Sequence, residues 1–205
     1  MKSGEFMKKI FILLFGLFIM TGCSAVRIDT NSIDNIVDVV LSKNNTLYNR
    51  IGRGYKYYKP RGVSYIDTLD LNDVLYSNGD YYYLYIDAIG YYYKAKIDIK
   101  ENKDAYYFKK IKLKDKEGYL EITKQSNGYH IEFVYNYAKI ETVVDEDKID
   151  EVVLNSSYIL STVKFNDNII GLMLDDEYFT NKEERYTLFE QKEENNNFLE
   201  YIEEQ

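Results

Sequence analysis

The chain has 205 residues, of which 45% are hydrophobic and 29% charged, so a single domain with a sizeable core is expected. Its net charge is −8, and from residue 24 onward it carries 23 basic and 33 acidic side chains. A surface this acidic is repelled by the phosphates of nucleic acids and by anionic lipid headgroups. Nucleic acid is therefore excluded as a partner, and any attachment to a membrane requires something other than side-chain charge.

The N-terminal residues have the organisation of a signal peptide. Residues 10–20 form an apolar run without charge, which follows Lys8-Lys9 and precedes small residues. Eleven residues are too few for a membrane-spanning helix, which needs about 20. Residues 1–22 are therefore predicted to be a cleaved signal peptide. Because Glu5 does not suit a basic leader, the prefix 1–6 is either not native or precedes a true start at Met7.

The end of this leader contains the only cysteine of the chain. The tetrapeptide Met20-Thr21-Gly22-Cys23 resembles the lipobox of bacterial lipoproteins, with Met in place of the commoner Leu. The resemblance covers residues 7–23 only. It implies that Cys23 carries diacylglycerol and becomes the first residue after cleavage. Because Cys23 has no partner for an intramolecular disulfide, lipidation also accounts for a lone cysteine in a secreted chain.

The expected location follows from this lipid. Stable anchoring requires more than one acyl chain, which diacylglycerol supplies. The protein is therefore expected on the extracytoplasmic face of the cell membrane, with residues 23–30 as a short tether. The alternative is a secreted protein that is never lipidated.

Residues 31–180 are predicted to form one domain that begins with a helix. Apolar residues recur with helical spacing over residues 32–51, with Asn31 or Ser32 as the cap and Gly52 and Gly54 as the stop. The pair Asn44-Asn45 is a place where this helix could bend or end early. Residues 53–60 follow as a basic, aromatic loop.

Strands are predicted for the middle of the chain. Period-two alternation, or β-rich composition, marks six segments, with turns at residues 76–80 and 126–128 and a hairpin about Gly90. The segments are 62–69, 81–89, 91–99, 105–113, 117–124 and 129–137. Beyond Ala138 the apolar phase shifts, which indicates a bulge or a bend.

The last part of the chain returns to helix. Residues 147–163 carry an apolar stripe of helical period, and residues 169–174 are a short apolar run that is predicted to be a buried strand. Residues 181–205 are acidic and rich in Asn, and are expected to be a solvated helix or a disordered tail. The order of elements predicts an α+β fold, with an antiparallel, curved sheet and helices on one face.

No catalytic constellation is evident. His130 is the only histidine and alternates with Glu132 on a polar strand face, so neither a triad nor a usual zinc site can be assembled. No cofactor motif is present, and the expected role is non-enzymatic. The remaining enzymatic alternative is an envelope hydrolase that uses two carboxylates alone, which two facing Asp or Glu side chains in a deep pocket would support.

The 23 tyrosines supply the other candidate site. Alternate tyrosines on strands often serve packing alone, but consecutive ones place rings on both faces of a sheet. Together with Lys56, Lys59 and Arg61 they could form an aromatic and basic patch that binds an envelope protein or a glycan. The residues proposed for this patch are Tyr55, Tyr57, Tyr58, Tyr81, Tyr83 and Tyr92.

Overall fold

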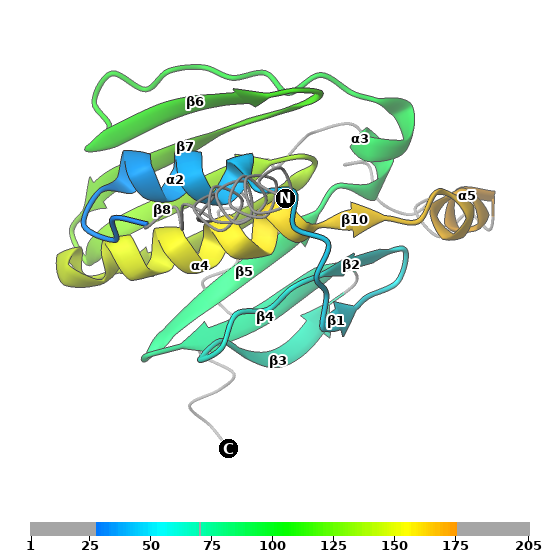
Figure 1. Ribbon diagram of the computed structural model, residues 1–205, viewed down its shortest axis with the longest axis horizontal. Coiled ribbons are helices and arrows are strands. Elements are labelled where there is room, and N and C mark those ends of the chain that lie inside the picture. Colours follow the sequence, from blue (N-terminus) through cyan, green and yellow to red (C-terminus); the bar gives the residue numbers. More distant parts are fainter. Residues whose placement is uncertain (1–27, 70, 176–205) are drawn as a thin grey trace, which may run out of the picture.

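The computed structural model describes residues 28–69 and 71–175, and an antiparallel seven-stranded sheet is its largest element (Figure 1). The strand order is β3-β4-β5-β9-β8-β7-β6, which leaves β3 and β6 as open edges. The predicted α+β class is confirmed. The strands are β3 (Ser64–Leu69), β4 (Asn72–Ser77), β5 (Asp80–Ile86), β6 (Tyr107–Leu113), β7 (Lys116–Gln125), β8 (Gly128–Tyr135) and β9 (Ala138–Val144).

Two helices lie side by side on one face of this sheet, α2 (Ile33–Ser42) and α4 (Ile149–Thr162) (Figure 1). The side chain of Ser32 caps α2 by accepting a hydrogen bond from the backbone N–H of Asn35. A short 3₁₀ helix, Glu146–Lys148, leads into α4, which packs against β8 and β9. The predicted helices at 32–51 and 147–163 both exist, although the first ends early.

The core lies between these helices and the sheet. On β5 the side chains of Tyr82, Leu84 and Ile86 are buried, and on β8 those of Ile131 and Phe133. Their alternation along each strand has the period of two that is expected of strands with one buried face. The opposite side chains of the same strands lie on a second face, away from α2 and α4.

A small second sheet joins distant parts of the chain. Its strand order is β1-β2-β10, with β1 (Arg50–Ile51), β2 (Tyr55–Tyr57) and β10 (Lys164–Phe165). Two short helices lie at the same end of the molecule, α3 (Ala88–Tyr93) and α5 (Asp167–Asp175) (Figure 1). This end therefore brings together residues near 50, 90 and 165.

Three sequence predictions are wrong in this region. The helix predicted over 32–51 ends at Ser42, after which the chain turns into β1. The strand predicted over 91–99 is instead α3 followed by irregular chain, because the side chain of Asp87 accepts the backbone N–H of Gly90 and starts a helix. The strand predicted over 169–174 is α5, whose start is capped by the Asn166 side chain accepting from the N–H of Ile169.

Further strands were not predicted. The loop expected over 53–60 contains β2, and β4 precedes the turn at Asn78-Gly79. The bend expected after Ala138 is a tight reversal at Asn136-Tyr137, where both residues have positive φ (54° and 60°) and the chain returns as β9. The predicted signal peptide, Cys23 and the tail at 181–205 lie outside the described residues.

Candidate functional site

The structure does not bring the six predicted patch tyrosines together. Tyr55 and Tyr57 are almost fully buried, with exposed fractions of 3% and 0%, so they are not part of a surface patch. Tyr81 and Tyr83 are half-buried on the sheet face away from the helices, whereas Tyr92 is exposed on α3. Tyr58 is half-buried beside the end of α4, where its N–H donates to the Thr162 hydroxyl.

Tyr55 and Tyr57 are buried with their hydroxyls hydrogen-bonded to the carboxylate of Asp73. The Tyr55 hydroxyl donates to Asp73 Oδ1 (2.9 Å), and the Tyr57 hydroxyl donates to Asp73 Oδ2 (2.7 Å). Thr68 donates a third hydrogen bond to Oδ1 (2.6 Å), and Arg50 Nε lies 3.6 Å from Oδ2. This carboxylate fixes β2 of the small sheet against β4 of the large one, because a buried charge requires such partners.

One side of β2 borders a pocket of about 460 Å³. Its walls come from β1, β2, β10, α3 and the start of α5, and they combine rings, apolar groups, amides and charges. The lining residues are Ile51, Gly52, Gly54, Tyr55, Lys56, Tyr91, Lys164, Phe165, Asn166, Asp167, Asn168 and Ile169. The volume is in the range of small-molecule sites in proteins.

Tyr91 and Phe165 form a fixed wall of this pocket. Their rings stack with centroids 3.9 Å apart, and the Tyr91 hydroxyl donates to Asp167 Oδ1 (2.8 Å). Lys94 Nζ lies 3.8 Å from the centroid of the Tyr91 ring. Burial raises the pKa of Tyr91 to about 12, and its hydrogen bond to Asp167 adds to the rise, so the hydroxyl keeps its proton at neutral pH.

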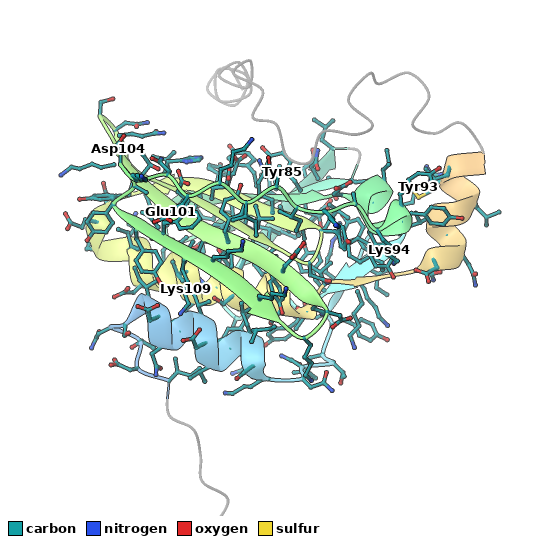
Figure 2. All side chains as sticks on the ribbon, turned by 90° about the horizontal axis from the view of Figure 1, so that it is seen from above. Tyr85, Tyr93, Lys94, Glu101, Asp104 and Lys109 are labelled. Carbon is teal, nitrogen blue, oxygen red and sulfur yellow. The ribbon has the colours of Figure 1, made fainter. Side chains whose placement is uncertain are left out.

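Positive charge gathers around the pocket although the chain is acidic. Lys56 and Lys164 line it, against the single carboxylate of Asp167. Burial lowers the pKa of Lys116; Asp115 opposes this, and the nearby Lys164 and Lys114 add to it. Figure 2 shows Tyr93 and Lys94 beside α5 at this end of the molecule. The pocket can therefore hold a negatively charged group next to apolar and aromatic surface.

The signal for this site is weak in the sequence. The lining comes from residues near 51, 91 and 166, which only the folded chain brings together. Of the residues expected in the aromatic and basic patch, Tyr55 and Lys56 border the pocket. Its two lysines are separated by more than 100 positions, so no local motif marks them.

A second polar cluster lies on the sheet face opposite the helices. Three glutamates stand in one row across neighbouring strands, because Glu121 is paired in register with Glu132 and Glu132 with Glu141. Lys139 is almost fully buried among them, and its Nζ lies 3.0 Å from Glu141 Oε1 and 3.9 Å from Glu132 Oε2. The Tyr119 hydroxyl donates to Glu132, and Asn102 donates to Glu121 (2.9 Å).

Burial decides the protonation of this cluster. Burial raises the pKa of Glu132, the neighbouring Glu141 raises it further, and Tyr119 and Lys139 oppose the rise. Burial also lowers the pKa of His130, whose Nε2 lies 3.8 Å from Glu141 Oε1. Ionisation of Glu132 is therefore less favourable than ionisation of a carboxylate in water.

The chain between α3 and β6 runs along this second face. The chain leaves the interior strand β5, forms α3, and then reaches the edge strand β6 through this connection. Figure 2 shows Asp104 of this connection, and Tyr85 of β5, on the side of the sheet away from α2. The hydrogen bond from Asn102 to Glu121 ties the connection to β7. The pocket described above is lined by none of the three glutamates.

The described residues add two further observations. Across 28–69 and 71–175, no group of three or more His, Cys, Asp or Glu side chains is arranged to hold a metal ion. Within the same ranges, no helix has the length and apolar character needed to cross a bilayer.

No protein-family model, curated protein or solved structure matches this chain. Its function is therefore argued from its own residues.

Proposed function

We propose that this protein is a lipid-anchored module of the bacterial envelope whose pocket at the small sheet binds a carboxylate-bearing ligand. The observation that carries the proposal is the pocket itself, in which Lys56 and Lys164 accompany the stacked pair Tyr91 and Phe165. Polar groups that can orient a ligand, set beside aromatic and apolar walls, are typical of ligand sites. The role proposed is binding rather than catalysis.

The two lysines of the pocket support binding of an anion there. Lysines set in a hollow concentrate the attractive field for a negatively charged ligand. Asn166 and Asn168 add amide groups that can donate to carboxylate oxygens. The aromatic and apolar walls favour a ligand that carries its acid on an apolar or flat body.

The anchoring part of the proposal rests on the sequence at residues 7–23. With Cys23 acylated, about eight residues separate the lipid from Ser32, the cap of α2, a reach of at most roughly 25–30 Å. The domain would then act close to the membrane surface. A partner in the cell envelope, either a protein or a glycan with carboxylates, suits this location.

The test is a titration with a pentaglutamate peptide, followed by calorimetry and by amide shifts in NMR spectra. We expect shifts at Ile51, Phe165 and Ile169, and at least about tenfold weaker binding in Lys56→Ala/Lys164→Ala, because two charge-assisted contacts are lost. The matched control is Lys110→Ala/Lys112→Ala, two exposed lysines on β6. Equal binding by both double variants, or shifts elsewhere only, would remove the pocket as the site.

A second candidate function is hydrolysis by a carboxylate pair. Glu132 and Glu141 face each other across β8 and β9, and burial raises the pKa of Glu132. Dyads that share a proton serve as acid and base in aspartic proteases. Tyr119 donates to Glu132, and Lys139 is paired with Glu141. Because these carboxylate oxygens already have partners within the protein, hydrolysis is a weaker candidate than ligand binding. Unchanged activity of Glu132→Gln and Glu141→Gln on any substrate found would dismiss it.

A further inference from the structure

We infer that residues 176–205, the segment that follows α5, occupy the same pocket in cis and compete with its ligand. This inference rests on the proposed function, because it assigns an internal competitor to the proposed binding site. It commits to one occupant, a segment of this chain. A second copy of the protein and an unrelated partner are the other outcomes of the test.

The first argument is the place where this segment starts. The first residues of α5, Asp167, Asn168 and Ile169, line the pocket. The helix has nine residues, which correspond to about 13 Å, so the chain leaves α5 only that far from the pocket. Thirty residues follow, with a maximal reach of roughly 100 Å. The segment can return to the pocket without strain.

The second argument is complementary charge. Residues 176–205 contain ten acidic and three basic side chains, so their net charge is −7. The pocket contributes Lys56 and Lys164 against one carboxylate, and Lys94 stands over its aromatic wall. Residues 24–175 carry 20 basic and 23 acidic side chains, so the segment holds most of the negative charge, and the lysines of the pocket lie near its start. Attraction between the segment and these lysines is therefore favoured.

The third argument is the apolar surface at this end of the molecule. Ile51 is 67% exposed, Leu172 is 63% exposed and Tyr93 is 60% exposed, while Ile169 and Tyr92 are also exposed. On the inner side of α5, Ile170 and Met173 are buried against the chain around Gly54. The outer side of the helix thus remains without a partner among the described residues. Residues 176–205 contain complementary apolar side chains: Tyr178, Phe179, Tyr186, Leu188, Phe189, Phe198, Leu199, Tyr201 and Ile202.

Covalent linkage makes even a weak contact effective. A tethered segment is present at its site at an effective concentration of about 1 mM. If the segment binds with a dissociation constant of about 0.1 mM, it fills the pocket roughly 90% of the time and weakens an added ligand about tenfold. Only a ligand with high affinity or a high local concentration would therefore displace the segment from the pocket.

The experiment measures the position of the segment by paramagnetic broadening in NMR spectra. The chain from residue 23 onward carries Cys23→Ser and Asn196→Cys, with a nitroxide label on the new cysteine. We expect broadening of the amides of Ile51, Phe165 and Ile169. The charge-reversed pocket, Lys56→Glu/Lys164→Glu, should lose this broadening, whereas the control Lys110→Glu/Lys112→Glu should keep it.

Three results would overturn the inference. The first is the absence of broadening at the pocket, and the second is broadening that centres on another surface and persists in the charge-reversed variant. The third is the same broadening in a mixture of labelled protein without ¹⁵N and unlabelled protein with ¹⁵N, which would make a second copy the occupant. Failure here is distinct from failure of the proposed function, because no ligand is added. If pentaglutamate binds at Lys56 and Lys164 but the label causes no broadening there, the proposed ligand site is retained and only the cis occupant is rejected.

Discussion

The substitution Asp73→Asn tests whether one buried carboxylate joins the two sheets. It keeps the size of the side chain and removes its charge. The hydroxyls of Tyr55, Tyr57 and Thr68 all donate to this carboxylate, at 2.6–2.9 Å. In the variant one oxygen becomes an amide NH₂, which donates only, so the tyrosine hydroxyl beside it loses its acceptor and must turn its proton away.

The expected loss of stability is about 3 kcal/mol. A hydrogen bond to a charged group contributes about 1 kcal/mol more than one between neutral groups, and three such bonds are changed. The ion pair with Arg50 is also lost, but Arg50 is partly exposed, so its share is small. Because native domains have a free energy of unfolding of only about 5–15 kcal/mol, this is a large effect.

Urea unfolding followed by far-UV circular dichroism gives the free energy of unfolding. The matched control is Asp67→Asn, an exposed aspartate on the neighbouring strand β3, for which a change below about 0.5 kcal/mol is expected. Tyr57→Phe removes one donor and should lose about 2 kcal/mol. An Asp73→Asn protein as stable as the Asp67→Asn control would show that the carboxylate does not hold the sheets together.

The remaining predictions concern the large sheet and α5. Glu132→Gln should be more stable than the wild type by up to about 1 kcal/mol at pH 8, and by less at pH 5, because the raised pKa of Glu132 means that ionisation beside Glu141 destabilises the folded state as the pH rises. Parallel urea midpoints at the two pH values would contradict this. Gly118→Ala should cost at least about 2 kcal/mol, since the added Cβ would lie 2.0 Å from the carbonyl oxygen of Val134. Gly171→Ala, where the nearest atom lies at 3.8 Å, should instead be neutral or stabilising by up to about 1 kcal/mol in thermal unfolding.

Where one face of an element is buried, the sequence predicted it well. The alternation of Tyr82, Leu84 and Ile86 on β5 follows directly from period two, and the apolar stripe of α4 follows from the helical period. The failures occur where capping outweighs composition. Aromatic residues at 91–93 favour a strand by propensity, but Asp87 starts a helix before them. Asn166 does the same for the apolar run of α5.

The site was less predictable than the fold. Tyr55 and Tyr57 were expected on a surface because their surroundings in the sequence are basic and polar, and nothing local shows that Asp73 receives both hydroxyls. The pocket depends on the pairing of β2 with β10, two strands more than 100 residues apart. Such long-range pairing has no signature in one sequence. The glutamate row arises in the same way from strand register, which places Glu121, Glu132 and Glu141 side by side.

The proposed role depends most directly on acylation of Cys23. The decisive measurement is the intact mass of the protein from its native host, together with its partitioning between membrane and soluble fractions, beside a Cys23→Ser variant. We predict that the wild type is cleaved before Cys23, carries the mass of the acyl groups and is found with membranes, and that the variant loses both acyl mass and membrane association. If wild type and variant have the same processing and are both soluble, the lipoprotein proposal is contradicted.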